Sequence, residues 1–141
     1  CFVKNRWIFV CNILAEKLFH FMIRHGKAPF LEASSKGDKR FSAFYAKVNG
    51  KSIEERYQAA KIFEDGSSGL GWREAKGKRA INQVAVSELY SELWDTYINQ
   101  HPELHDVLRN VTGISDMFGQ VGHVCQATEL WRIKCQRFSD S

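Results

Sequence analysis

Several features that define special classes of protein are scarce or absent in this sequence. Only 2 of the 141 residues are proline, so little prevents long helices from forming. An apolar run from Trp7 to Leu14, interrupted by Asn12, is too short to span a bilayer. The four cysteines contain no Cys-x-x-Cys pair and match no common zinc pattern, so we expect no metal site. These absences argue against a membrane-spanning protein and against the usual zinc-binding modules.

The composition is that of an ordinary globular domain. Apolar residues make up 44% and charged residues 26% of the chain. A chain of 141 residues fits one domain, and it buries roughly 68% of its unfolded surface, enough to fold without a disulfide or a metal. Reduced cysteines in a cytoplasmic protein are the simplest interpretation of the cysteine usage.

Positive charge is concentrated near the beginning of the sequence. The net charge is +4, yet the first 40 residues carry eight Lys or Arg against three Asp or Glu. The remainder is therefore not a typical basic nucleic-acid-binding surface. The first methionine is Met22, so we expect residues 1–21 to be a non-native, unstructured or incidentally helical extension and residues 22–141 to form the domain. Lys4 and Arg6 before the apolar run leave a weak signal peptide as an alternative.

Residues 41–63 carry local signals for a strand, a turn and a helix. Residues 41–48 are aromatic and alternating, which predicts a strand. Asn49-Gly50 predicts a hairpin turn, because both residues tolerate positive φ. Ser52 and Glu55 have the spacing of a capping box, so a helix is expected from Ile53 to about Phe63.

The clearest periodic pattern in the chain predicts a second, longer helix. Its apolar residues recur at helical spacing: Val86, Leu89, Tyr90, Leu93, Trp94, Tyr97 and Ile98. This stripe is far more typical of a core than of an aromatic binding platform. Pro102 suits the first turn of a short helix that stops near Thr112-Gly113. Residues 25–40 are expected to form strand and loop, residues 67–71 and 114–123 loops, and residues 130–134 the last packed element.

Three groups of residues could carry chemistry. Glu54, Gln58 and Lys61 share one helical stripe, and together they could activate water and hold a polar ligand. The alternative is an ordinary solvated helix face. Asp116 lies in a Gly-rich loop beside an aromatic residue, where it could bind a sugar hydroxyl or simply cap a turn. Residues 72–79 place basic side chains around a glycine and could hold phosphates, or could form a solvated basic turn.

The order and spacing of these motifs resemble the NADAR family. Phe41-Ser42-Ala43-Phe44 is similar to that family's Phe-Ser-Asn-Phe strand, and residues 49–52 to its Asp-Gly-Lys turn. The family then has a helix carrying Glu-His, with Gln four and Lys seven residues after the Glu. Glu54, Gln58 and Lys61 match those positions without a gap.

The second half of the chain extends the resemblance, which covers residues 41–134. Residues 75–78 resemble the family's small basic Ala/Gly segment, and residues 101–112 its Pro-Glu-Leu helix. Residues 116–120 lie where the family has Asp-x-Phe/Tyr-Trp-Gly, and residues 130–134 resemble its closing Leu-Met-x-x-Arg. The sequence departs from the family at three positions: it has Ala43 for Asn, Glu55 for His and Phe118 for Trp.

The resemblance implies an α+β, mostly α fold: a single NADAR-like domain with a short hairpin or strand region and a bundle of helices. It also implies an N-glycosidase that acts on ADP-ribosylated guanine or on a ribosylamino-pyrimidine phosphate, as in antitoxin, defence or riboflavin-pathway proteins. Glu54, Lys61 and Asp116 would be catalytic. The implied substrate-binding residues are Phe44, Gln58, Arg73, Lys76, Arg79, Phe118, Gly119 and Gln120. No cofactor, metal or membrane is implied, and the partner is a nucleotide-like small molecule or ADP-ribosylated nucleic acid.

Two other functions fit the same residues. The chain could be a non-catalytic binder of ADP-ribose or of a nucleotide on the same fold. It could also be a small helical protein that touches nucleic acid through residues 72–79. The enzyme requires Glu54 and Asp116 to converge, whereas the other two functions do not.

Overall fold

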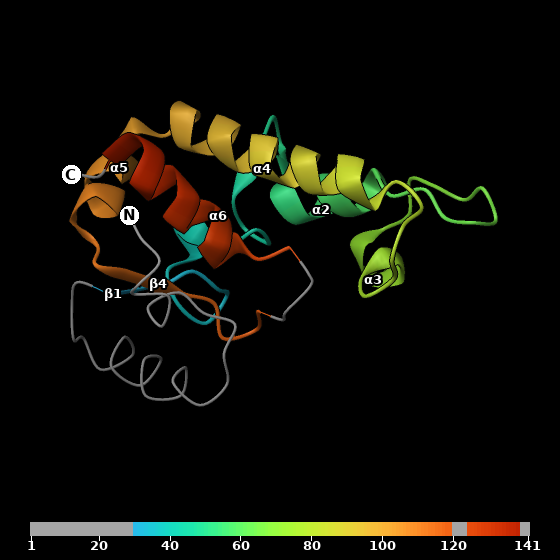
Figure 1. Cartoon of the computed structure of the whole chain (residues 1–141), viewed down its shortest axis with the longest axis horizontal. Coiled ribbons are helices and arrows are strands. Elements are labelled where there is room, and N and C mark those ends of the chain that lie inside the picture. The colour runs from blue at the N-terminus through green and yellow to red at the C-terminus, as the bar shows by residue number, and fades with distance from the viewer. Residues whose placement is uncertain (1–29, 120–123, 139–141) are drawn as a thin grey trace.

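A computed structural model describes residues 30–119 and 124–138, arranged as in Figure 1. The extension expected over residues 1–21 and the expected binding residue Gln120 lie outside these ranges. The helices are α2 (Ile53–Ala59), α3 (Trp72–Ala75), α4 (Gln83–Gln100), α5 (His105–Asn110) and α6 (Gln126–Ile133). The strands are β1 (Phe30–Glu32), β2 (Lys47–Val48), β3 (Lys51–Ser52) and β4 (Gly113–Ser115). Short 3-10 turns cover Lys39–Phe41 and Pro102–Leu104, and a π-helical turn covers Lys134–Phe138.

The hairpin turn and the capping box are confirmed. β2 and β3 pair antiparallel, and Asn49 and Gly50 both have positive φ, 51° and 87°. The Ser52 side chain accepts from the Glu55 backbone N–H, and the Glu55 side chain accepts from the Ser52 backbone N–H. α2 ends at Ala59, sooner than expected, because the backbone then turns and Phe63 N–H pairs with the Ser67 carbonyl.

The strand expected over residues 41–48 is wrong for most of its length. The backbone N–H groups of Phe41, Tyr45 and Ala46 bond to carbonyls three or four residues earlier, so this segment coils instead of extending. Only Lys47–Val48 is strand. The alternating pattern failed as a guide because local turn hydrogen bonds satisfy the backbone that a sheet would otherwise pair.

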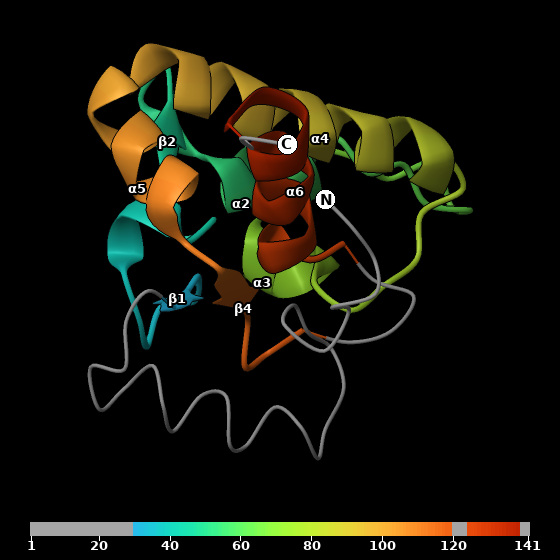
Figure 2. The same ribbon diagram turned by 60° about the vertical axis from the view of Figure 1, so that its left-hand side comes forward.

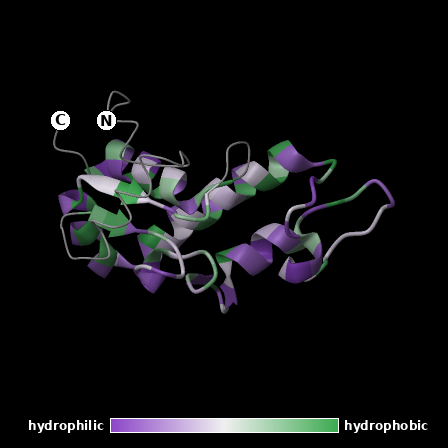
Figure 3. Ribbon diagram, turned by 90° about the horizontal axis from the view of Figure 1, so that it is seen from below, coloured by the Kyte–Doolittle hydropathy of each residue, from purple (hydrophilic) through white to green (hydrophobic). Residues whose placement is uncertain are grey.

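The long helix is confirmed as core. α4 buries six of the seven residues of its predicted stripe, and Leu89 is partly buried against the core. Trp94 and Ile98 are completely enclosed. In Figure 3, hydrophobic and hydrophilic residues alternate around the turns of the helices, as expected when one face of each helix is buried.

β4 was expected to be part of a loop, and the structure corrects this. Gly113, Ile114 and Ser115 pair in parallel with Phe30, Leu31 and Glu32 of β1. The two strands lie 83 residues apart in sequence, and each is only three residues long. No local sequence pattern predicts this pairing, because neither strand has a hairpin partner next to it in the chain.

The architecture is α+β and mostly α, in one small domain. α4 packs against α2 on one part of its length and against α6 on another, while α6 packs on β4 (Figures 1 and 2). The segment between α2 and α3 extends away from the body (Figure 1). Within the two described ranges, every helix is too short or too polar to cross a membrane. Cys135 is disulfide-bonded, which corrects the expectation of reduced cysteines, while Cys125 is buried and forms no disulfide.

Candidate functional site

The stripe on α2 is buried. Glu54 and Gln58 lie on α2 and are only 8% and 4% exposed, so the alternative of a solvated helix face is wrong. Lys61 was expected on the same helical stripe, but it lies two residues beyond the end of α2 and is 4% exposed. The capping box sets where α2 begins, and the Glu54 backbone N–H then donates to the Ala43 carbonyl at 3.0 Å. This contact ties the first turn of α2 to the segment that precedes the hairpin.

Glu54 and Gln58 form a buried pair. Gln58 Nε2 donates to Glu54 Oε2 at 2.7 Å, as the i, i+4 spacing allows. This hydrogen bond orients the amide, because the opposite orientation would place two acceptor oxygens against each other. Gln58 Oε1 is buried and accepts no hydrogen bond from any described residue. A buried acceptor without a donor costs roughly 1–3 kcal/mol, which makes Gln58 a candidate for contact with a ligand.

Lys61 is held by backbone oxygens. Its Nζ donates to the carbonyls of Lys78 at 2.8 Å and of Ala75 at 3.3 Å, and it lies 5.1 Å from the centre of the Tyr57 ring. The two carbonyls flank a type II turn in which Gly77 has a φ of 80°. Burial lowers the pKa of Lys61 below its ordinary 10.5, and the Glu54 carboxylate opposes that shift. Lys61 thus joins α2 to the basic turn at residues 75–79.

Asp116 lies directly after β4 and is 5% exposed. Its Oδ1 accepts from the Phe118 backbone N–H at 2.9 Å, and its Oδ2 accepts from Gln126 Nε2 at 3.0 Å. The Gln126 oxygen accepts in turn from the Ala43 backbone N–H. Because the Ala43 carbonyl accepts from the Glu54 N–H, Gln126 and Ala43 connect the loop of Asp116 to the start of α2.

The charges of both carboxylates affect the pKa of one buried tyrosine, Tyr90. Tyr90 of α4 is enclosed, and burial raises its pKa well above the ordinary value of 10.0. The Glu54 and Asp116 carboxylates and the Cys125 thiol raise the pKa of Tyr90 further, because a phenolate there would face their negative charge. The charges of Glu54 and Asp116 therefore affect the same buried tyrosine.

Sequence reasoning missed Glu32. This carboxylate, 3% exposed, accepts from Ser115 Oγ at 2.7 Å and from the Met117 backbone N–H at 3.0 Å. It therefore holds both sides of Asp116. Gly37 packs so closely that an added Cβ would lie 2.1 Å from the Glu32 carbonyl oxygen. The available signal was an acidic residue beside apolar residues in the short segment Phe30-Leu31-Glu32.

Phe44 and Phe118, two of the residues expected to bind the substrate, lie in different surroundings. Phe44 packs edge-on against Trp72, with ring centres 5.1 Å apart, and Lys76 lies 5.5 Å from the Phe44 ring. Arg73 lies over Trp72 at 4.7 Å. Among the described residues no ring contact joins Phe44 to Phe118, whose side chain is 57% exposed. The Gly119 backbone N–H donates to the Asp116 carbonyl at 3.0 Å. Trp72 is thus a candidate ring that the sequence-based set did not include.

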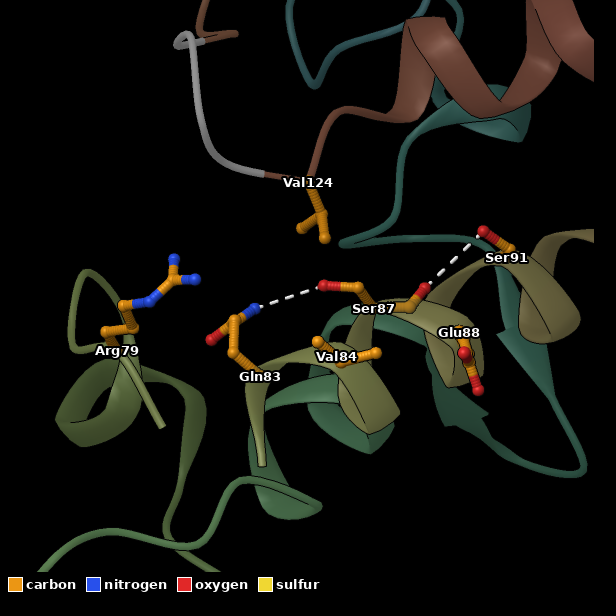
Figure 4. Close-up of a pocket in the computed structure, with 7 residues that line it drawn as sticks. All are labelled: Arg79, Gln83, Val84, Ser87, Glu88, Ser91 and Val124. Carbon is orange, nitrogen blue, oxygen red and sulfur yellow. Dashed lines mark hydrogen bonds between the residues drawn. The ribbon is translucent and has the colours of Figure 1, made fainter. Parts of the chain in front are cut away.

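A groove of about 480 Å³ runs along the first half of α4 (Figure 4). Its lining residues are Arg79, Gln83, Val84, Ser87, Glu88, Ser91 and Val124. Gln83 Nε2 donates to the Tyr57 hydroxyl at 3.0 Å, which links the groove to α2. Burial raises the pKa of Tyr57, with a further increase from Glu54 and an opposing effect from Arg79, so the phenol senses both charges. A second groove, of about 550 Å³, is lined by other α2 residues, including Glu55, Arg56 and Ala59.

The fold and the site define a small α+β protein in which Ala43 and Gln126 connect two buried carboxylate residues, and in which Gln83 connects a polar groove to α2. Comparison with known proteins finds no matching family model, no matching curated protein and no matching solved structure. Within the described ranges, no group of three or more His, Cys, Asp or Glu side chains is placed to hold a metal ion.

Proposed function

We propose that this protein is an N-glycosidase of the NADAR type, which hydrolyses the N-glycosidic bond of a ribosylated base. The observation that carries the proposal is the chain of hydrogen bonds that links Glu54 to Asp116. The Glu54 N–H donates to the Ala43 carbonyl, the Ala43 N–H donates to the Gln126 side-chain oxygen, and Gln126 Nε2 donates to Asp116 Oδ2. A buried carboxylate is costly unless it is well compensated, and two of them in one region are typical of a functional site. Within the described residues, the Glu54 carboxylate accepts one hydrogen bond, from Gln58.

The chemistry of the bond matches these groups. Breaking the C1–N bond of a riboside builds positive charge on the sugar ring, which a nearby carboxylate stabilises. The oxygen of water attacks C1, the C1–N electron pair leaves with the base, and one proton of the water passes through a basic group to the departing nitrogen. Glu54 is suited to stabilise the sugar cation and to take the proton, because its hydrogen bond to Gln58 orients it.

The other residues have separate parts in the proposal. Asp116 is held by Gln126 and by the Phe118 backbone, so it is suited to bind ribose hydroxyls in a fixed position. Lys61 supports the catalytic groups through its electrostatic attraction to Glu54 and fixes the basic turn. The exposed Arg73, Lys76 and Arg79 are suited to meet phosphates. The substrate is ADP-ribosylated guanine or a ribosylamino-pyrimidine phosphate.

Replacing Glu54 by Gln tests the proposal. The change keeps the shape and removes the charge, so release of ADP-ribose or of ribose phosphate should fall by about 10²–10⁴. Glu55→Gln is the matched control: it makes the same change one residue away, on an exposed side chain where Gln also completes a capping box. The control should retain wild-type turnover, and both variants should retain the wild-type circular dichroism spectrum.

Two outcomes would overturn the proposal. If Glu54→Gln turned over both substrates at the wild-type rate, Glu54 would have no catalytic role. If the wild type cleaved neither substrate but bound ADP-ribose in a calorimetric titration, the chain would be a non-catalytic binder on the same site.

A further inference from the structure

Polar side chains form a row along the groove on α4. Gln83, Ser87 and Ser91 follow each other at intervals of four residues, so they lie on one face of the helix (Figure 4). Ser91 Oγ donates to the Ser87 carbonyl at 3.4 Å. None of these three residues belongs to the set that the sequence motifs singled out. The row faces a groove whose volume of about 480 Å³ is in the range of small-molecule sites.

Hydrogen bonds within the protein fix how this row is presented. Both atoms of the Gln83 amide are engaged: Nε2 donates to the Tyr57 hydroxyl and to Ser87 Oγ at 3.2 Å, and Oε1 accepts from the Ala80 N–H at 3.3 Å. Because Ser87 Oγ accepts from Gln83, its own proton must point elsewhere. No described residue accepts that proton, so the Ser87 hydroxyl offers a donor to a ligand in the groove.

Charged and apolar groups complete the lining. Arg79 is exposed at one end of the groove, and its guanidinium makes no ion pair or hydrogen bond with any described residue (Figure 4). Glu88, also exposed, supplies a carboxylate acceptor, while Val84 and Val124 supply apolar walls. A free guanidinium and a hydroxyl donor suit a phosphate group, and a carboxylate acceptor suits a sugar hydroxyl.

We propose that this groove binds the phosphorylated ribose of a nucleotide, with the phosphate on Arg79 and Ser87 and a ribose hydroxyl on Glu88. The inference rests on the proposed function, because a phosphorylated ribose is part of the proposed substrate. The hydrogen bond from Gln83 to Tyr57 connects the groove to α2. The charges of Arg79 and Glu54 both affect the pKa of Tyr57, in opposite directions.

Calorimetric titration with ribose 5-phosphate tests the groove, with ribose and inorganic phosphate as partial ligands. The wild type should bind ribose 5-phosphate more tightly than either part. Arg79→Gln should weaken binding by about 10- to 100-fold, and Ser87→Ala by about 10-fold, since each removes a charge-assisted hydrogen bond. Arg137→Gln is the matched control: it removes the same charge from an exposed residue of the C-terminal turn, outside the groove, and should leave the affinity unchanged.

The outcomes separate this inference from the proposed function. Equal losses of affinity in Arg79→Gln and Arg137→Gln would show a general charge effect and would overturn the inference about the groove. Wild-type affinity in both Arg79→Gln and Ser87→Ala would also overturn it. So would a wild-type protein that does not bind ribose 5-phosphate. If Arg79→Gln and Ser87→Ala lose binding although the wild type hydrolyses neither substrate, the groove stands and the glycosidase fails. If the wild type hydrolyses its substrate and both groove variants bind ribose 5-phosphate with wild-type affinity, the glycosidase stands and the groove fails.

Discussion

The two carboxylates of the candidate site are held in opposite ways. Glu54 lies on one short helix, and its partner Gln58 is four residues away on that helix. Asp116 is held by Gln126 and is flanked by contacts from Glu32, which lies more than 80 residues earlier in the chain. We call the first group, Glu54 and Gln58 of α2 together with Lys61 just after it, the helical half. We call the second group, Glu32, Asp116 and Gln126, the assembled half.

The two halves differ in how completely their side-chain oxygens are hydrogen-bonded. In the assembled half, the Glu32 and Asp116 carboxylates each accept hydrogen bonds at both oxygens. In the helical half, the Gln58 oxygen has no donor among the described residues. A fully satisfied polar network rigidifies its surroundings, whereas an incompletely satisfied one gains energy when a ligand completes it. The assembled half is therefore suited to hold Asp116 in a fixed position. In the helical half, a ligand could supply the donor that the Gln58 oxygen lacks among the described residues.

The largest expected effect concerns the core that both halves share. Trp94 is completely buried in α4, and its ring packs edge-on against Tyr97 at 5.6 Å. Trp94→Ala should lower the free energy of unfolding by about 3–5 kcal/mol, measured by urea denaturation. Fluorescence and circular dichroism should report a single transition, because α4 packs against elements of both halves. A loss below about 1 kcal/mol would contradict the core assignment.

The next effect separates the two halves directly. Gln126→Leu removes two hydrogen bonds, to Asp116 and from Ala43, and should cost about 2–3 kcal/mol of unfolding free energy. Gln58→Leu removes the one hydrogen bond that the Glu54 carboxylate accepts from a described residue, but it also removes a buried oxygen that has no donor among the described residues. The second change offsets part of the first, so Gln58→Leu should cost less than Gln126→Leu, about 1–2 kcal/mol. Both losses of unfolding free energy are measured by urea denaturation. Equal losses would show that the side chains of the two halves are equally well hydrogen-bonded, which would contradict the difference between them.

The smallest effect is a dependence of stability on pH. Because the folded pKa of Lys61 lies below 10.5, the unfolded chain binds more protons between those two values, and stability rises with pH there. This contribution is complete above 10.5 and is lost as the pH falls through the folded pKa. Lys61→Met keeps the aliphatic stem and removes the titrating group. The difference in unfolding free energy, wild type minus Lys61→Met, should therefore increase as the pH rises toward 10.5.

Subtracting the variant removes Tyr90 and Tyr97 from that comparison. Tyr57, Tyr90 and Tyr97 have raised pKa values in the folded state, so each lowers stability as the pH passes its unfolded value of 10.0. The contributions of Tyr90 and Tyr97 are common to both proteins and cancel in the difference. Making both measurements in a Tyr57→Phe background removes the contribution of Tyr57, whose ring lies 5.1 Å from Lys61 Nζ. A flat difference across this range would mean that Lys61 titrates alike in the folded and unfolded states.

The helical half could be predicted from the sequence because its geometry is local. A capping box sets where α2 begins, and residues four apart on a helix share a face wherever the helix lies. The same reasoning identified the apolar stripe of α4 and the turn at Asn49-Gly50. It could not tell whether the polar stripe of α2 faced solvent, since burial depends on what packs against the helix.

Tertiary structure alone decided the assembled half. Glu32 reaches Asp116 only because β1 pairs in parallel with β4, and three-residue strands carry too little pattern to reveal that pairing. Gln126 joins the two halves because α6 packs on β4, which brings its side chain between the Asp116 carboxylate and the Ala43 backbone. Local spacing determined which side chains share the face of one helix. Only long-range packing connected that helix to the second carboxylate, through Gln126 and Ala43, and to the groove on α4, through Gln83.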